Sequence, residues 1–302
     1  MKQAVIDIGS NTVRMLIAGC PDGSPEIYRY ERCITRLAGG FDPVTGLSAA
    51  ARQRTFEALC RFAGRLRQEE IPCLRAVGTA ALRRAPNRQQ FIDEVRQGCG
   101  LQIEVIDGDE EARLMTAGIL SVVRPAPPRA VLLDIGGGST EIVASERGRV
   151  VFQQSFPIGV VRLVEDCPTP EQRQKPIDAM VTAFVRACPW CNQLPAGDLG
   201  LIATAGTVTT LAAMHLELSR YDAAAINNHR LPADWIQQLY TRLLPLSPGE
   251  RETLPGMEPG RGDLLPAGME IILALVARLG VDQVTVADAG LLEGLFLAAC
   301  SN

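Results

Sequence analysis

Two stretches of the chain repeat one pattern: AVIDIGSNTVRMLIAG at residues 4–19 and AVLLDIGGGSTEIVAS at residues 130–145. Each is a short apolar run that ends in Asp-Ile-Gly, followed by small polar residues and a second apolar run. Such runs, rich in Val, Ile and Leu and separated by glycines, predict two strands joined by a tight turn. The repetition predicts a duplicated domain whose halves face each other across a phosphate-binding cleft.

The chemistry of the two turns supports this interpretation. Backbone N–H groups in a glycine turn can surround phosphate oxygens, because no side chain blocks their approach. A carboxylate, Asp7 or Asp134, stands at the end of each first strand. Carboxylate oxygens are typical ligands of hard divalent cations, so either residue is a candidate metal ligand.

Composition limits the class of protein. The 302 residues suffice for two domains with full cores, and the net charge of −4 argues against a general nucleic-acid binder. A polyanionic ligand must therefore meet a local basic site. No apolar run approaches the roughly 18 residues of a membrane span, and the first strand begins too close to Met1 for a signal peptide. We expect a cytoplasmic protein without a membrane partner.

The chain has nine cysteines and two histidines. Most of the cysteines occupy apolar settings, where a reduced thiol packs as a small hydrophobe; examples are Cys20, Cys60, Cys73 and Cys300. Cys188 and Cys191 form a CxxC pair, which can be a redox pair, half of a zinc site, or a helix end with two chance thiols. His215 and His229 have no nucleophile or ligand spacing near them, and we interpret both as structural or surface residues.

Strand and helix signals alternate along both halves, which favours an α/β fold over all-α or all-β. The proline-rich segment 125–128 cannot continue a helix and makes a stiff linker. We therefore predict an N-terminal domain at 1–124 and a C-terminal domain at 125–302.

Six small-residue turns follow apolar runs or precede helices. In open α/β sheets such turns gather at the strand ends where ligands bind, and helix N-termini there attract anions. The six turns are Asp7–Thr12, Gly78-Thr79, Asp107–Glu111, Asp134–Thr140, Thr204–Thr207 and Asp288–Gly290.

The turn at Asp107–Glu111 carries a cluster of acids. Acidic residues in the first turn of a helix are common for dipole reasons alone. Beside phosphate-binding turns, however, a carboxylate repels the substrate unless it has a task such as deprotonating water. Guanidinium groups bind phosphate in a bidentate way, so three arginines are candidate phosphate ligands: Arg83, Arg84 and Arg113. The alternative interpretation of each is a solvated surface arginine.

Several motifs together resemble the exopolyphosphatase/guanosine pentaphosphate phosphatase (Ppx/GppA) family, in its short two-domain form. They are VIDIGSNT, VGTAALR, VIDGDEEARL, LLDIGGGSTE, ATAGT and VADAGLLEG. The match extends from Val5 to the last helix. The family belongs to the actin/Hsp70/sugar kinase superfamily, so the resemblance implies two actin-like, ribonuclease H-like α/β domains with an active site in the interdomain cleft.

The resemblance also implies site residues. Glu111 corresponds to the catalytic base and Arg83 to the arginine of the family's GTxxLR motif. Mg²⁺ (or Mn²⁺) is expected near Asp134 and Glu141, with Asp7. The expected phosphate-binding residues lie in the glycine turns: Gly9, Ser10, Asn11, Thr12, Gly136, Gly137, Gly138, Ser139, Thr140, Gly206 and Thr207.

Two departures from the family pattern stand out. Asp107 occupies a position where the family commonly has Ser or Thr, and an extra acid there could tune metal preference or raise the pKa of Glu111. The segment at 260–263 resembles the family's R-x-D segment, with Gly262 between the Arg and the Asp.

The implied activity is release of terminal orthophosphate from inorganic polyphosphate, by attack of a water that Glu111 activates. Hydrolysis of the 5′-phosphate of guanosine pentaphosphate is the alternative, since the same turns can hold either anhydride. A sugar or acetate kinase is disfavoured by the GDEEARL motif. A non-catalytic polyphosphate- or nucleotide-sensing module is disfavoured by the intact acids Glu111, Asp134 and Glu141. A homodimer is compatible with the sequence.

Overall fold

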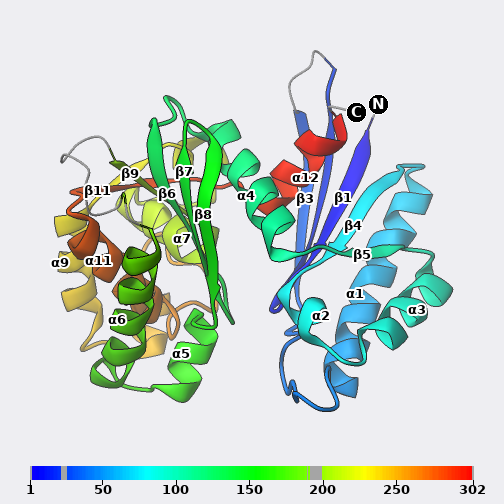
Figure 1. Cartoon of the computed structure of the whole chain (residues 1–302), viewed down its shortest axis with the longest axis horizontal. Coiled ribbons are helices and arrows are strands. Elements are labelled where there is room, and N and C mark those ends of the chain that lie inside the picture. Colours follow the sequence, from blue (N-terminus) through cyan, green and yellow to red (C-terminus); the bar gives the residue numbers. More distant parts are fainter. Residues whose placement is uncertain (1, 22–25, 189, 191–198, 301–302) are drawn as a thin grey trace. The chain divides into compact units, whose positions relative to one another are not determined.

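A computed structural model of the chain describes residues 2–21, 26–188, 190 and 199–300 (Figure 1). The chain forms two compact units. The first comprises Met1–Gly118 together with Leu291–Asn302, and the second comprises Ile119–Gly290. Each unit contains one β-sheet with helices packed on it, as the alternating strand and helix signals predicted.

The first unit has a five-stranded sheet in the order β3-β2-β1-β4-β5. The strands are β1 (Gln3–Ile8), β2 (Thr12–Gly19), β3 (Glu26–Ile34), β4 (Cys73–Gly78) and β5 (Ile103–Val105). The helices are α1 (Ala49–Gln68), α2 (Ala80–Arg84), α3 (Arg88–Cys99), α4 (Gly108–Val122), which crosses into the second unit, and α12 (Leu291–Cys300). Strands β1, β4 and β5 run parallel, whereas β1, β2 and β3 are antiparallel neighbours.

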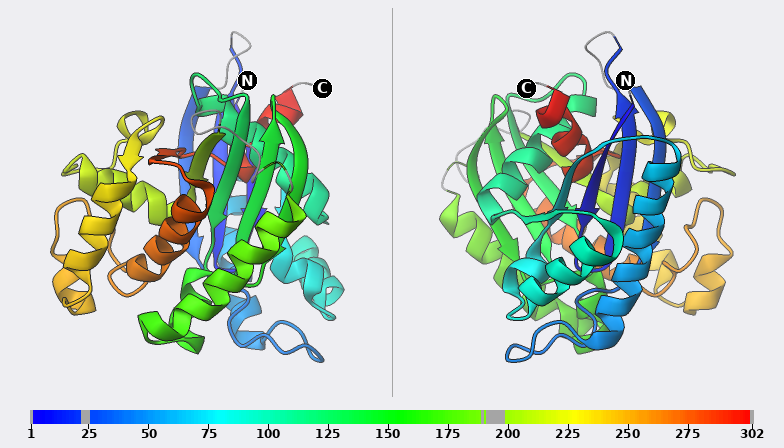
Figure 2. Two further views of the ribbon diagram at one scale, coloured as in Figure 1. Left: turned by 60° about the vertical axis from the view of Figure 1, so that its left-hand side comes forward. Right: turned by 90° about the vertical axis from the view of Figure 1, so that its right-hand side faces the viewer.

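Alternate residues of β1 point to opposite faces of this sheet, as the two-residue period of a strand requires. Ile6 and Ile8 face a core that includes Phe62 of α1 and Phe91 of α3. Val5 faces a smaller core on the other side, which the apolar side chains of α12 fill. Figure 2 shows α1 and α3 together on one face of the strands.

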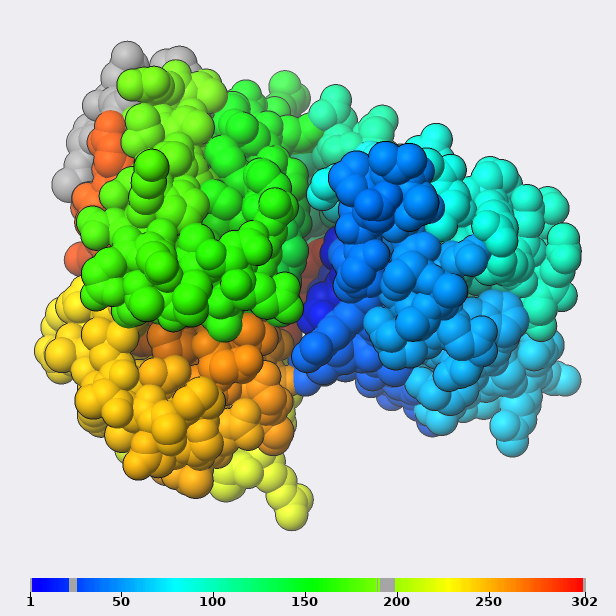
Figure 3. All heavy atoms as spheres, turned by 90° about the horizontal axis from the view of Figure 1, so that it is seen from below, coloured from blue at the N-terminus to red at the C-terminus, as the bar shows by residue number. Residues whose placement is uncertain are grey.

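The second unit has a six-stranded sheet in the order β10-β11-β9-β6-β7-β8. The strands are β6 (Arg129–Ile135), β7 (Thr140–Glu146), β8 (Arg149–Phe156), β9 (Leu199–Thr204), β10 (Arg230–Pro232) and β11 (Gln283–Val286). The helices are α5 (Val160–Asp166), α6 (Pro170–Ala187), α7 (Ala205–His215), α8 (Ala223–Ile226), α9 (Ala233–Leu243), α10 (Pro248–Glu252) and α11 (Leu265–Leu279). Helices α9 and α10 lie at the surface, in yellow in Figure 3.

A buried ion pair joins three helices of the second unit. Arg173 of α6 binds both carboxylate oxygens of Glu270 of α11, at 2.7 and 2.8 Å. The hydroxyl of Tyr240 of α9 donates to the same carboxylate at 2.8 Å. Burial, with the hydrogen bond to Glu270 next in size, raises the pKa of Tyr240, which therefore remains a donor at neutral pH.

The two sheets share a topology, which confirms the duplication predicted from the repeat. In each, an antiparallel hairpin is extended by a third antiparallel strand on one side and by a parallel strand on the other. The matching strand orders are β3-β2-β1-β4 and β8-β7-β6-β9.

The division of the chain differs from the predicted boundary after residue 124 at two points. The first unit ends inside α4, and the C-terminal helix α12 returns to the first unit. Leu292, Leu295 and Phe296 of α12 are buried against β1, β2 and β4. Gly294 lets α12 approach α4 so closely that a Cβ atom there would lie 1.9 Å from the carbonyl oxygen of Leu114. Sequence order alone gave no sign of this return.

The close approach of α12 to α4 predicts opposite effects for two glycine substitutions. We expect Gly294→Ala to lower the free energy of unfolding by about 1–3 kcal/mol, because backbone must move to admit the methyl group. Gly64→Ala in α1 is the matched control, because among the described residues no atom beyond the helix's own neighbouring backbone lies within 4 Å of the new Cβ. It should raise stability by about 0.5–1 kcal/mol through helix propensity. Thermal unfolding of both variants checks this, and equal effects would contradict the packing.

Candidate active site

The two repeated hairpins close in the same way. The N–H of Gly9 donates to the carbonyl of Thr12 at 3.0 Å, and the N–H of Gly136 donates to that of Ser139 at 2.9 Å. A Cβ atom at Gly9 or Gly136 would lie 3.1 or 3.0 Å from those same carbonyl oxygens. The turn therefore favours glycine at this position in both copies.

Neighbouring segments bind the carbonyl side of both turns. Segment 35–38 donates three N–H groups to the carbonyls of Ser10 and Asn11, and the start of α5 donates to those of Gly136 and Gly137. In the described part of the chain, the N–H groups of Ser10, Asn11, Gly137 and Gly138 have no acceptor. Each turn thus presents backbone N–H donors that can hydrogen-bond to an anion.

The hairpins differ at one pair of positions. In the first, Asp7 stands directly opposite Arg14, and Arg14 Nε donates to Asp7 Oδ2 at 2.9 Å. In the second, the corresponding Asp134 stands directly opposite Glu141. Like charges opposite each other on neighbouring strands destabilise a sheet. The first carboxylate is therefore neutralised by an arginine, whereas the second hairpin places two acids side by side.

The donor atoms of the second hairpin fit a hard divalent cation. Asp134 and Glu141 supply carboxylate oxygens from one face of the sheet, and the hydroxyls of Ser139 and Ser155 lie 2.7 Å from Glu141 Oε1. Oxygen ligands of this kind suit Mg²⁺. Among the described residues, no cluster of three His, Cys, Asp or Glu side chains is arranged to hold an ion. Any cation there must complete its shell with substrate oxygens or water.

Asp7 is placed differently. It is 1% exposed, and its second carboxylate oxygen, Oδ1, is buried without a hydrogen-bond partner in the described structure. A buried acceptor left unpaired is costly, so this oxygen is a position where a ligand can be accommodated. The ion pair with Arg14 makes Asp7 a weaker candidate for a metal ligand than Asp134.

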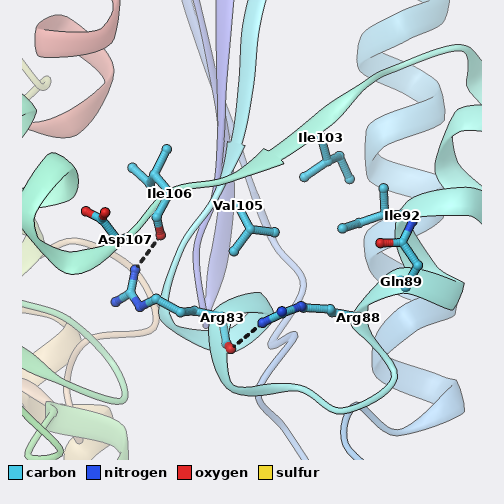
Figure 4. A pocket seen from close by; sticks show the side chains of 8 residues that line it. All are labelled: Arg83, Arg88, Gln89, Ile92, Ile103, Val105, Ile106 and Asp107. Atoms are coloured by element: carbon cyan, nitrogen blue, oxygen red, sulfur yellow. Dashed lines mark hydrogen bonds between the residues drawn. The ribbon is translucent and has the colours of Figure 1, made fainter.

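The predicted base and arginine lie together. Arg83 Nη1, in α2, is 2.9 Å from Glu111 Oε2, in the first turns of α4, and donates to the carbonyl of Ile106 at the same distance. Both side chains are partly buried, with 28% and 17% exposure. Arg83 also lines a pocket of about 430 Å³, with Asp107 at its rim (Figure 4).

Two other acids of the cluster, Asp107 and Glu110, have structural roles. Asp107 accepts the N–H of Glu110 at 2.8 Å and so acts as the N-cap of α4. Ser, Thr and Asp all cap helices, which explains why Asp can replace the family's Ser or Thr here. Glu110 binds Arg75 at 3.0 Å, on β4, and so does not share the partner of Glu111.

The third turn begins α7. Thr204 donates its hydroxyl to the carbonyl of Ala289, and Ala205 adopts a φ of +70°, a region that few non-glycine residues occupy. Thr207 is buried, and a Cβ at Gly268 of α11 would lie 2.5 Å from its side chain, so its hydroxyl is enclosed between two helices. Thr140 is likewise enclosed, donating to the carbonyl of Ile158. Both side chains are buried rather than exposed to solvent, and that of Thr140 binds the backbone.

Arg261 is a residue whose importance the sequence understated. Its guanidinium covers Gly206, since a Cβ there would lie 1.7 Å from Nη2, and its Nε binds Glu258 at 2.7 Å. Burial lowers the pKa of Arg261, but an arginine remains charged at neutral pH. It thus brings a cation to the N-terminus of α7. The RGD segment at 261–263 was the available signal.

The remaining candidates lie elsewhere. Arg84 packs over the ring of Phe41, and Arg113 is 63% exposed, 3.9 Å from Glu110. The sequence gave no sign that the two histidines meet. In the structure they are in contact, with His215 Nδ1 and His229 Nε2 2.7 Å apart. Cys188 ends α6 and is buried, whereas its CxxC partner Cys191 lies outside the described residues.

Two similar α/β units, each opening on a glycine hairpin, define a protein of the two-domain actin-like fold. The model of the Ppx/GppA phosphatase family matches residues 16–302. The chain belongs to this family, as its motifs indicated, and is an enzyme.

Individual relatives agree with this assignment. Exopolyphosphatase 2 of Mycobacterium tuberculosis is 35% identical over 98% of this chain and 97% of its own. The guanosine-5′-triphosphate,3′-diphosphate pyrophosphatase of Aeromonas hydrophila is 28% identical, and this chain covers 59% of its length. The crystal structure of the Aquifex aeolicus Ppx/GppA family member superposes with a TM-score of 0.83 at 28% identity, covering 99% of this chain and 97% of that one. Within the described residues, no helix is both long and apolar enough to cross a bilayer.

The position of Arg261 predicts the effect of filling the space at Gly206. We expect Gly206→Ala to weaken binding of orthophosphate about tenfold, because the methyl group displaces a guanidinium whose charged hydrogen bond is worth about 1.5–3 kcal/mol. Isothermal titration calorimetry measures this. Gly249→Ala in α10, where a Cβ meets no atom within 4 Å, is the control. Unchanged phosphate binding in a folded Gly206→Ala protein would remove Arg261 from the site.

Proposed function

We propose that this protein is an exopolyphosphatase, which releases terminal orthophosphate from inorganic polyphosphate by attack of water. The observation that carries the proposal is the pairing of Glu111 with Arg83 at 2.9 Å, since it supplies a held carboxylate beside a phosphate-binding type of side chain. The similarity to exopolyphosphatase 2 over nearly the whole chain supports the choice of substrate.

Glu111 is proposed as the general base. Its Oε2 is fixed by Arg83, which is itself fixed by the carbonyl of Ile106, so the carboxylate has a defined direction. The Glu111 carboxylate would accept a proton from water as the water oxygen attacks the terminal phosphorus. The bond from that phosphorus to the bridging oxygen then breaks, which yields orthophosphate and a chain one phosphate shorter.

The cation would be held by Asp134 and Glu141. When bound, Mg²⁺ (or Mn²⁺) would neutralise charge on the phosphoryl oxygens. Ser139 and Ser155 orient the Glu141 carboxylate by their hydrogen bonds to Oε1. Asp7, with one oxygen on Arg14 and one buried and unpaired, would take part only through Oδ1.

The glycine turns would bind the phosphate oxygens. The N–H donors of Ser10, Asn11, Gly137 and Gly138 are fixed in direction because their carbonyls or neighbours are already bound, so they need no reorganisation during the reaction. At the start of α7, Gly206 and Arg261 would add a helix N-terminus and a guanidinium. Positioning and electrostatics of this kind account for most of phosphoryl-transfer catalysis.

Guanosine pentaphosphate is the second candidate substrate, favoured by the 28% identity to the Aeromonas hydrophila enzyme. The donors described above recognise phosphate charge and spacing rather than a base. This chain also covers only 59% of that relative, so a segment outside the match could carry further recognition there.

The assignment of the base predicts different effects for two neighbouring acids. Glu111→Gln should reduce turnover by about 10²–10⁴-fold, with substrate affinity nearly unchanged, because the amide keeps the shape but cannot accept a proton. Glu110→Gln is the matched control, since Glu110 binds Arg75 instead, and it should keep most of the activity. Phosphate release at fixed substrate concentrations measures both. A Glu111→Gln enzyme with more than about a tenth of wild-type turnover would exclude this base.

Competition kinetics test the substrate. With polyphosphates of several lengths, guanosine pentaphosphate and ATP, we expect the highest kcat/KM for polyphosphate and the lowest for ATP, because the donors read charge and anhydride spacing. Phosphate release should stop when a chelator is added in excess, and added Mg²⁺ should restore it. A preference of about tenfold or more for guanosine pentaphosphate would favour the second candidate. Release from none of these substrates would favour a sensing module.

A further inference from the structure

Two cysteines from opposite ends of the chain are in contact in the first unit. Cys20 follows the last residue of β2, and Cys300 is the last residue of α12. Their Sγ atoms lie 2.9 Å apart, although 280 positions separate them in the sequence. Cys20 packs at the edge of the small core under α12, and Cys300 is exposed. One thiol is therefore reachable from solvent and the other lies directly behind it.

The elements that carry these thiols are both well anchored. β2 is paired along its length with β1 and β3, and α12 buries Leu292, Leu295 and Phe296 against the sheet. A disulfide needs its sulfurs about 2.05 Å apart, so closing the pair requires less than about 1 Å of movement. The folded protein holds the two thiols in a position to react with each other.

We infer that Cys20 and Cys300 form a reversible disulfide when the protein meets an oxidant of the small-disulfide class, such as oxidised glutathione. The Cys300 thiolate attacks one sulfur of glutathione disulfide and releases one glutathione thiolate. The Cys20 thiolate then attacks the sulfur of Cys300, forms the intramolecular bond and releases the second glutathione. The two protons of the protein thiols end on the two reduced glutathione molecules, so the exchange balances.

The environment of the pair makes it a slow switch. The pKa of the Cys300 thiol is raised to about 11. Desolvation is the largest cause, followed by the hydrogen bond and the charge of Cys20. Little thiolate is then present at neutral pH, and the thiolate is the attacking species. The pair therefore responds to sustained oxidising conditions rather than to a brief pulse.

The bond would fasten the C-terminal helix to the sheet. α12 follows Gly290, where the chain passes from the second unit back to the first, and Cys300 ends its last turn. Linking it to β2 closes nearly the whole chain into one loop, which restricts the unfolded state strongly. The inference is independent of the proposed function, because neither thiol belongs to the turns or to the Glu111 pair.

A peptide map tests the bond directly. The full-length protein is incubated with oxidised glutathione, alkylated and digested with trypsin without reduction. Cleavage after arginine gives Met15–Arg29 and Leu279–Asn302, each with one cysteine. We expect these two peptides joined, with the mass of two hydrogens lost, and separated again by dithiothreitol. The melting temperature of the oxidised protein should rise by about 5 °C.

Three variants control for other thiols. Cys20→Ser and Cys300→Ser should each abolish the linked peptide and the thermal shift, whereas Cys167→Ser, in the second unit, should keep both. Cys99 is buried, and desolvation together with the neighbouring Cys99 raises the pKa of Cys60 to about 11. Both thiols should therefore appear in the map as alkylated cysteines without a disulfide. Persistent glutathione adducts on Cys300, or a linked peptide that excludes Cys20, would overturn the inference.

Discussion

The turn that begins at Gly9 and recurs at Gly136 is the constraint on which the rest of the molecule depends. Its single hydrogen bond, from the glycine N–H to the carbonyl three residues on, sets the register of each hairpin. That register puts Asp7 opposite Arg14 and Asp134 opposite Glu141. Because adjacent strands place such partners on one face, the turn decides which charges meet, and it also leaves the N–H groups at its tip free for an anion.

A second constraint operates where β5 passes into α4. Asp107 caps the helix, which fixes the direction of its first turn and separates two consecutive acids. Glu110 binds Arg75 and Glu111 binds Arg83, so neighbours in sequence have different partners. The arginine that orients Glu111 also binds a backbone carbonyl, and this second contact prevents it from following the carboxylate. The contact with Arg83 therefore gives the Glu111 carboxylate a defined direction.

Most of the architecture could be predicted because local signals carried it. The duplicated hairpins and the alternation of strands and helices follow from patterns that are local or repeated in the sequence. Glu111 and Arg83 were named through the family resemblance, whereas the ion pair between them is a finding of the structure. The return of α12 to the first unit could not be predicted, since it depends on a missing side chain at Gly294 facing a carbonyl on another helix. The contacts of His215 with His229 and of Cys20 with Cys300 were not predicted either, because each joins elements that only tertiary packing brings together.

The difference between the two hairpins suggests how a duplicated unit acquires two tasks. In both copies the same turn presents N–H donors, so both retain the capacity to bind phosphate oxygens. One difference on the opposite strand, Arg14 in one copy and Glu141 in the other, changes the charge beside the aspartate that both copies share. The first hairpin pairs its aspartate with a cation of its own, whereas the second places two acids directly opposite each other. The divalent cation proposed above would reduce the repulsion between those acids, so one backbone geometry would serve anion binding in one unit and metal binding in the other.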